Sequence, residues 1–391
     1  MLIRPLNIEF RLSNDLLRTT LDKIFNGNHS MLAGFVAGNL TESGRQKLIT
    51  VLQKFPGKYH IVENDGSNQI EFYIEKSVLA DKLNLTGNEN PVIRELLKVF
   101  ENYENYKSGT FGIGNRIYKM DKFHIMGIVN VTPDSFSDGG QFYTYESAIS
   151  HGIEMYDNGV DFIDIGGEST RPGAEKVSTK EELRRVIPVI EGILAKRPDA
   201  VISVDTTKSE VARQALERGA KIINDISGLT FDDEMIDVAA LYGAAVVIMH
   251  IKGTPQTMQN NPYYEDVIEE IYAFLDERIK TAEQAGIKDI IIDPGIGFGK
   301  RVKDNYEILA RLDEFKGLGK PLLIGLSRKS FIGKALNLEV GKRDFATLIS
   351  ERLAIGKGAV IVRTHNYKKL IDAEKINYFI QNPNRVELNN V

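Results

Sequence analysis

Short apolar runs rich in Val and Ile recur between residues 124 and 365, and amphipathic stretches of helical length separate them. Most runs are continuous rather than alternating, which is typical of parallel strands covered by helices. The predicted strands are His124–Thr132, Phe162–Gly167, Val201–Thr207, Ile222–Ser227, Ala244–His250, Ile290–Gly295, Pro321–Ser327 and Ala359–His365. Eight strand–helix units in roughly 265 residues predict an α/β fold of the (β/α)8 TIM barrel type, which typically takes about 250.

Two further features support the barrel. The sequences "STKE" at Ser178–Glu181 and "TKSE" at Thr207–Glu210 fit the capping box and predict helix starts after the second and third strands. An open doubly wound sheet is disfavoured, because "GIGFGK" at 295–300 lacks the G-x-G-x-x-G spacing and follows the sixth strand. No Walker A sequence occurs.

The first 105 residues have a different pattern. Apolar residues have helical spacing in "LLRTTLDKIF", "GRQKLITVLQKF" and "VIRELLKVF", whereas "KYHIV" and "QIEFYI" are typical of strands. We therefore predict a small α+β domain at residues 1–105 and the barrel at residues 106–391. The segment "FGIGNRIYKM" predicts a hairpin that covers the floor of the barrel. No motif in residues 1–105 indicates a chemistry.

Composition excludes several classes of function. The chain has 391 residues, and its 49 Lys and Arg against 54 Asp and Glu form no long block of one sign, so we expect no nucleic-acid partner. No apolar run approaches the roughly 18 residues of a membrane span, and no signal peptide is evident, so a cytoplasmic location is expected. The absence of Cys excludes disulfides, thiolate nucleophiles and Cys-based metal sites.

Polar side chains follow all eight predicted strands, at the end of the barrel where active sites lie. Arg363, His365 and Asn130 come from the last and first strands, which are neighbours in a closed barrel. Arginine offers a fork of donors, histidine offers one more, and an asparagine carbonyl can bind Mg²⁺. This set predicts a site for a phosphate or diphosphate with its cation.

A second set consists of Asp205, Asn224, Asp293 and Lys329. A carboxylate accepts two parallel hydrogen bonds from an amino-pyrimidinone edge, asparagine both donates and accepts, and lysine donates to a ring oxygen or nitrogen. A single Asp at a strand end is more often a turn former, and Asp164 and Asp225 are read as barrel-lining hydrogen-bond partners outside this set. Eight strands that all end in polar groups on one rim favour function, here a site for a flat, polar heterocycle.

These residues lie in motifs that resemble those of the dihydropteroate synthases, within the pterin-binding barrel family. The motifs, in family order, are "NVTPDSFSDGG", "GGESTRPG", "SVDT", "NDISG", "MH-x-x-GTP-x-TMQ", "DPG-x-GFGK", "GLSRKSFIG" and "R-x-H". The resemblance covers about residues 110–380 and leaves the N-terminal region out. It implies a transferase of folate biosynthesis that forms a C–N bond between 6-hydroxymethyl-7,8-dihydropterin diphosphate and p-aminobenzoate, with 7,8-dihydropteroate and pyrophosphate as products. It also implies a homodimer formed through barrel helices.

The resemblance assigns roles to individual residues. The pterin would be bound by Asp205, Asn224, Met249, Asp293 and Lys329. The diphosphate would be bound by Asn130, Arg171, Arg363 and His365, with Asn130 acting through Mg²⁺. The p-aminobenzoate would be bound by Phe136, Thr170, Pro172, Phe298, Lys329 and Ser330. The catalytic residues would be Lys329, Arg171 and Asp205.

Some positions depart from the family pattern. The sequence "RTHN" at 363–366 differs from the common "RVHD", and Asn366 could alter how His365 is oriented. Three alternatives are the same chemistry with another arylamine in a modified-folate pathway, a pterin-dependent methyltransferase, and a non-catalytic pterin-binding protein. A methyltransferase or a binder has no need of the diphosphate residues, so these residues favour the synthase.

Overall fold

The computed structural model describes residues 1–53, 59–63, 68–83, 90–131, 145–171 and 173–385. Eight parallel strands form one sheet in the order β12-β11-β10-β9-β8-β7-β14-β13, and a bridge between Ile292 and Leu322 joins its two ends. The strands are β7 (His124–Asn130), β8 (Phe162–Gly166), β9 (Val201–Asp205), β10 (Ile222–Asp225), β11 (Ala245–Met249), β12 (Ile290–Asp293), β13 (Leu323–Gly325) and β14 (Ile361–Thr364). The predicted barrel is confirmed.

Each strand ends one or two residues before the predicted end. At β12, the carboxylate of Asp293 accepts a hydrogen bond from the backbone N–H of Gly295 at 2.7 Å. This local bond replaces the next rung of the ladder. Asn130, Asp205, Asp225 and Asp293 are the last residues of their strands, so their side chains stand at the rim of the barrel.

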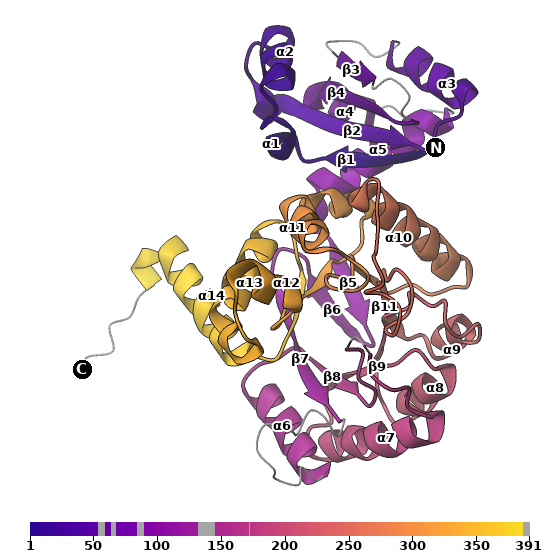
Figure 1. The fold of residues 1–391 in the computed structure, drawn as a ribbon, viewed down its shortest axis with the longest axis vertical. Helices are drawn as coiled ribbons and strands as arrows, with labels where there is room; N and C mark the ends of the chain where they lie inside the picture. Colours follow the sequence, from indigo (N-terminus) through magenta and orange to yellow (C-terminus); the bar gives the residue numbers. More distant parts are fainter. Residues whose placement is uncertain (54–58, 64–67, 84–89, 132–144, 172, 386–391) are drawn as a thin grey trace.

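Helices surround the barrel (Figure 1). They are α6 (Tyr145–Asp157), α7 (Thr179–Lys196), α8 (Ser209–Glu217), α9 (Met235–Tyr242), α10 (Val267–Gln284), α11 (Val302–Ala310), α12 (Ser330–Leu336), α13 (Asp344–Gly356) and α14 (Tyr367–Gln381), with a 3-10 segment η4 (Leu312–Leu318). Ser178 caps α7 as predicted, since its hydroxyl accepts from the N–H of Glu181. The prediction of a capping box at Thr207–Glu210 is wrong. Helix α8 begins at Ser209, whose backbone N–H donates to the carboxylate of Asp232 at 2.7 Å, and Asp232 lies in the loop before α9.

The N-terminal region is α+β, as predicted, with an antiparallel sheet in the order β1-β2-β4-β3. The strands are β1 (Leu2–Leu6), β2 (Leu32–Gly38), β3 (Tyr59–Glu63) and β4 (Ile70–Glu75), and the helices are α1 (Ile8–Arg11), α2 (Asp15–Phe25), α3 (Glu42–Leu52), α4 (Lys76–Leu83) and α5 (Pro91–Glu104). Strands β1 and β2 were not predicted, because a buried Arg4 and several small residues hide their strand pattern. The boundary at residue 105 stays a prediction.

A hairpin covers the floor of the barrel, as predicted. Strands β5 (Thr110–Ile113) and β6 (Arg116–Lys119) pair antiparallel. The backbone N–H of Gly112 bonds Asp289 at 3.1 Å, and Arg116 bonds the carbonyl of Asp199 at 2.8 Å. Asp289 directly precedes β12 and Asp199 lies two residues before β9, so these contacts lie at the amino ends of the strands, opposite the rim.

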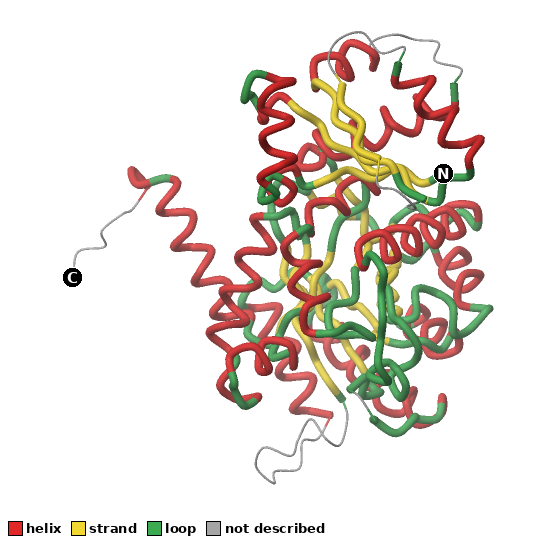
Figure 2. Tube along the Cα trace, turned by 45° about the horizontal axis from the view of Figure 1, so that its top comes forward, coloured by secondary structure: helices red, strands yellow, loops and turns green. Residues whose placement is uncertain are grey.

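A buried ion network joins the N-terminal sheet to the barrel. Arg4 of β1 is fully buried, and its guanidinium lies 2.7 Å from Glu269, 2.5 Å from Glu314 and 3.1 Å from Asp266. Arg311, also buried, bonds Glu314 at 2.9 Å. Buried charges are tolerated only when they are paired in this way. Figures 1 and 2 show the N-terminal sheet stacked against one side of the barrel, with α14 extending away from it.

We expect Arg4→Ala to lower the free energy of unfolding of the full chain by about 3–5 kcal/mol, because it leaves buried carboxylates without their cation. Urea unfolding followed by circular dichroism measures this. Arg18→Ala, on the exposed face of α2, is the matched control and should change the stability little. An Arg4 variant as stable as this control would show that the network does not hold the two parts together.

Candidate active site

The rim brings the two predicted residue sets into one network (Figure 1 labels β7, β8 and β9 among the strands that carry them). Arg363, from β14, donates through Nε to Asp164 at 2.6 Å and through Nη2 to Asp205 at 2.7 Å. Asn224, from β10, donates to the same oxygen of Asp164 at 3.0 Å. The predicted diphosphate residue Arg363 thus contacts a predicted pterin residue, and the two sets form a single site.

Asp164 is the residue of this network that sequence reasoning placed outside the site. It is fully buried in β8, inside the apolar run "FIDIG", and a charged residue in such a run is the signal that points to it. Its Oδ1 finds no hydrogen-bond partner among the described residues, nor does the hydroxyl of Ser203, which lies beside it on β9. Unpaired polar atoms at the centre of a barrel favour contact with a polar ligand or water.

Burial sets the charge of Asp205. Loss of solvent raises the pKa of this carboxyl, Arg363 opposes the rise, and Asp164, Glu182 and Asp225 add to it. Arg363 therefore does more than orient Asp205. It supplies the positive charge that favours the ionised form needed to accept two hydrogen bonds.

Asp293, Lys329 and Phe298 meet on the opposite part of the rim. Burial raises the pKa of Asp293, and the charge of Lys329 opposes this. Burial lowers the pKa of Lys329 to about 8. Its ammonium donates to the carbonyl of Ile296 and lies 4.8 Å from the centre of the Phe298 ring. Phe298 packs in turn against an apolar cluster that contains Met249.

His365 and Asn130 lie side by side where β14 and β7 are neighbours. The amide nitrogen of Asn130 lies 3.4 Å from Nε2 of His365, and Nδ1 of His365 lies 2.9 Å from the hydroxyl of Ser327. Partial desolvation and nearby arginines lower the pKa of His365 to about 4, so the ring is neutral near pH 7. Ser327 was not predicted; its place in "SRKS", before Lys329, is the available signal.

Thr364 and Asn366, the two positions that depart from the family pattern, both hydrogen-bond residues of α13. The buried hydroxyl of Thr364 accepts from the N–H of Asn366 at 3.2 Å and hydrogen-bonds Glu351, a carboxyl whose pKa burial raises to about 8. The Asn366 amide donates to Asp344 at 3.0 Å. The hydrogen bonds of Asn366 thus go to Thr364 and Asp344, and those of His365 to Ser327 and Asn130.

The remaining predicted residues are less constrained. Arg171 and Ser330 are exposed, on the loop after β8 and at the start of α12, and Thr170 is half-buried. The positive charge of Arg171 contributes to the lowered pKa of His365, which places the two near each other. Phe136 and Pro172 lie outside the described residues.

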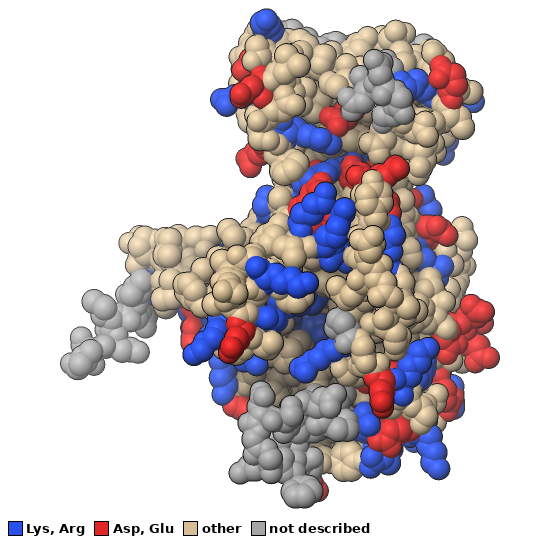
Figure 3. Space-filling view, viewed as in Figure 1, with Lys and Arg blue, Asp and Glu red and all other residues tan. Residues whose placement is uncertain are grey.

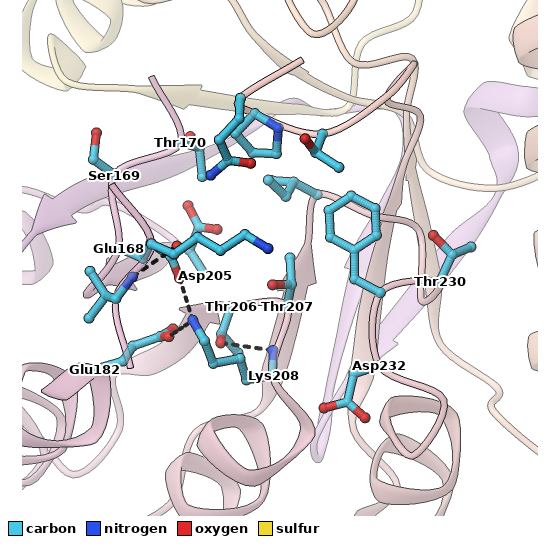
Figure 4. Close-up of a pocket in the computed structure, with 17 residues that line it drawn as sticks. Glu168, Ser169, Thr170, Glu182, Asp205, Thr206, Thr207, Lys208, Thr230 and Asp232 are labelled. Carbon is cyan, nitrogen blue, oxygen red and sulfur yellow. Dashed lines mark hydrogen bonds and ion pairs between the residues drawn. The ribbon is translucent and has the colours of Figure 1, made fainter. Parts of the chain in front are cut away.

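A cavity of about 500 Å³ opens beside Asp205 (Figure 4). The loops that follow β8, β9, β10 and β11 form it, and Thr170 and Ile226 lie on its wall. Lys208, which sequence reasoning did not single out, contacts Glu168 and Glu182 in the same wall. The cavity connects the buried Asp205 with the loop that carries Thr170.

Comparison with known proteins identifies the family of the barrel. A family model described as pterin binding enzyme matches residues 126–365. The chain is 48% identical over 268 residues to dihydropteroate synthase from Synechocystis, covering 68% of this chain and 92% of that protein. It is 48% identical to the Escherichia coli K12 enzyme, covering 65% and 90% respectively.

Solved structures of dihydropteroate synthases resemble the barrel of this chain. The dihydropteroate synthase of Xanthomonas albilineans with 4-aminobenzoic acid is 44% identical and superposes with a TM-score of 0.65, covering 70% of this chain and 98% of that one. The same enzyme with 7,8-dihydropteroate is 41% identical, with a TM-score of 0.63 and coverage of 70% and 99%. The matched part is the barrel that carries the rim network described above. On this evidence the chain belongs to the dihydropteroate synthase family of pterin-binding enzymes.

Proposed function

We propose that this chain condenses 6-hydroxymethyl-7,8-dihydropterin diphosphate with p-aminobenzoate, and releases 7,8-dihydropteroate and pyrophosphate. The observation that carries the proposal is the bonding of Arg363 to Asp205, because it places a group for an anionic leaving group next to a carboxylate for a pterin edge. Figure 3 shows Lys and Arg gathered around the hollow of the barrel face, which suits an anionic substrate.

The pterin ring needs a flat slot with polar edges. Asp205 and Asp293 accept hydrogen bonds from ring N–H and amino groups, and Asn224 both donates and accepts. Lys329 donates to a ring oxygen or nitrogen from the same rim. These side chains stand on barrel strands, or directly after one, so they hold the ring with little reorganisation.

Departure of pyrophosphate leaves positive charge on the pterin CH2 carbon, which the electron-rich ring delocalises. Nε and Nη2 of Arg363 are engaged by carboxylates, so Nη1 is the nitrogen that we assign to the diphosphate. His365, neutral near pH 7, donates through one ring nitrogen. The weakly basic arylamine then forms the C–N bond from beside Phe298 and Lys329 and loses one N–H proton. The released pyrophosphate or water takes up this proton, so no strong general base is required.

Mg²⁺ fits this site as a substrate-borne cation. The described residues contain no cluster of three His, Asp or Glu able to hold a metal. Asn130 turns its amide nitrogen toward His365, which leaves the amide oxygen for a hard cation, and Mg²⁺ usually takes its other ligands from phosphates and water. When bound, it would neutralise the leaving diphosphate. No helix in the described part of the chain could span a membrane, and the cytoplasmic location stays a prediction.

The first test is pyrophosphate release by the full chain with the dihydropterin diphosphate and Mg²⁺, with and without p-aminobenzoate. Release that depends on p-aminobenzoate, with dihydropteroate formed, supports the proposal. Release only with another arylamine would identify a modified-folate enzyme. Pterin binding without release would favour a non-catalytic protein or a methyltransferase.

Replacement of Lys329 tests the proposal that this one residue contacts both the pterin and the arylamine. We expect Lys329→Met to lower kcat/KM by at least ~10²-fold, because a preorganised charge in the site is lost. Lys334→Met, on the exposed face of α12, is the matched control and should keep wild-type kinetics. Wild-type kinetics in the Lys329 variant would remove this residue from the site.

The pH dependence of kcat/KM should be bell-shaped. Below the raised pKa of Asp205 the carboxyl is protonated and loses an acceptor, so the acid limb should lie well above pH 4. Above about pH 8 Lys329 loses its proton and donates less well, so activity should fall there. Stopped assays from pH 5 to 10 measure both limbs. In Lys329→Met the residual activity should lack the alkaline limb, and an unchanged limb would contradict the assignment.

We also propose a homodimer through α13 and α14. Phe345, Ile349 and Leu353 lie four residues apart on one face of α13, and Phe345 and Leu353 are 74% and 65% exposed. On α14, Ile380 is 73% exposed. Exposed apolar side chains that form a contiguous face usually mark an interface.

Light scattering after size-exclusion chromatography tests the dimer. The wild-type chain should elute as a dimer, and Phe345→Glu with Leu353→Glu should elute as a monomer, since charges would be buried in the interface. Leu241→Glu on α9, at a residue that is 79% exposed outside this face, is the control and should remain dimeric. A dimeric double variant would place the interface elsewhere.

A further inference from the structure

Lys208 occupies a central place in the wall of the cavity (Figure 4). It follows Asp205 by three residues, between β9 and α8, and its ammonium contacts two carboxylates. One is Glu182 of α7, at 2.5 Å, and the other is Glu168, in the loop after β8. A single cation thus links a helix of the barrel wall to a loop of the rim.

Glu168, at the start of the loop after β8, also hydrogen-bonds the end of that loop. Its second carboxylate oxygen accepts a hydrogen bond from the backbone N–H of Val177 at 3.3 Å. The segment from 168 to 177, which is described except at residue 172, therefore has its two ends tied by one side chain, and its described part carries Thr170 and Arg171. Arg185 adds a bond from α7 to the carbonyl of Gly167 at 2.8 Å.

Glu182 differs from Glu168 in what it touches. It is fully buried on α7, one of its oxygens lacks a hydrogen-bond partner among the described residues, and it makes no contact with the backbone of segment 168–177 in the hydrogen bonds of this region. Lys208 neutralises Glu182 inside the wall, and Glu168 is the carboxylate through which the ammonium contacts the loop.

We propose that Lys208 is a positioning residue for the arylamine: through Glu168 it holds the loop at residues 168–177 so that Thr170 and Arg171 face the reacting groups. This deepens the proposed function and rests on it. The proposed pterin contacts come from the barrel strands and the segment that follows β13, so we expect the effect of Lys208 to fall on the arylamine and on the diphosphate contact of Arg171, and not on the ring.

The two carboxylates give a matched pair of variants. Glu168→Gln should raise the KM for p-aminobenzoate about tenfold, because loss of the ion pair lets the loop shift by a fraction of an ångström to one ångström. Glu182→Gln, which leaves Glu168 paired with Lys208, should keep this KM within about threefold of wild type. Equal effects of the two variants, or no effect of Glu168→Gln, would overturn the proposal.

Lys208→Met tests the cation itself and separates positioning from stability. It should raise the KM for p-aminobenzoate as Glu168→Gln does, and it should also lower Tm, because Glu182 is left buried without its partner. Adding Glu182→Gln to it should recover Tm and leave the KM raised. If the KM recovered together with Tm, the role of Lys208 would be structural only and the proposal would be wrong. Lys180→Met, on an exposed position of α7, is the control for the loss of a lysine.

Binding of the ring alone provides a readout that needs no turnover. Calorimetry with 6-hydroxymethylpterin, which lacks the diphosphate, should give the same Kd within about twofold for wild type, Glu168→Gln and Lys208→Met. A large loss of ring binding would show that Lys208 acts on the whole site and would overturn the proposal. Failure of wild type to release pyrophosphate would instead reject the proposed function.

Discussion

The candidate site depends on one guanidinium that neutralises two buried carboxylates. Asp164 and Asp205 stand on neighbouring strands, and two carboxylates this close together at this depth are stable only with a cation beside them. Arg363 reaches both from β14 across the barrel interior. It therefore fixes the charge of the rim and its geometry together. The same side chain would make the proposed pterin edge and the proposed leaving-group site parts of one electrostatic unit.

Sequence reasoning predicted the barrel, its eight strands and the rim, because apolar runs and the residues after them are local signals. It did not predict that Arg363 would meet Asp205, since the two are 158 residues apart and their contact exists only in the closed barrel. Strand β1 was not predicted for the same reason. Arg4 looks like a surface residue until its three carboxylate partners, all more than 250 residues away, are brought to it by folding.

The N-terminal part and the site use buried charge in different ways. Around Arg4 the guanidinium meets three carboxylates of the barrel, so the network joins two parts of the chain, and one oxygen of Glu269 is left without a partner among the described residues. At the rim, Asp164 keeps an oxygen without a partner in the described structure, and Lys329 bonds only a carbonyl while a carboxylate, Asp293, is close enough to influence its pKa. Incomplete pairing of this kind costs stability, and it is tolerated where a substrate completes it.

Helix α13 connects the rim to the surface that we propose for the dimer. Its inner side presents Asp344 to Arg328, and Thr347 accepts from the backbone N–H of Arg328 at 3.2 Å. Arg328 has a positive φ of 55°, a strained conformation that these bonds hold in place, and it directly precedes Lys329. The outer side of the same helix carries Phe345 and Leu353. A partner that packs on the outer side would therefore rigidify the helix that holds the lysine loop, so in this fold assembly and active-site geometry share one element.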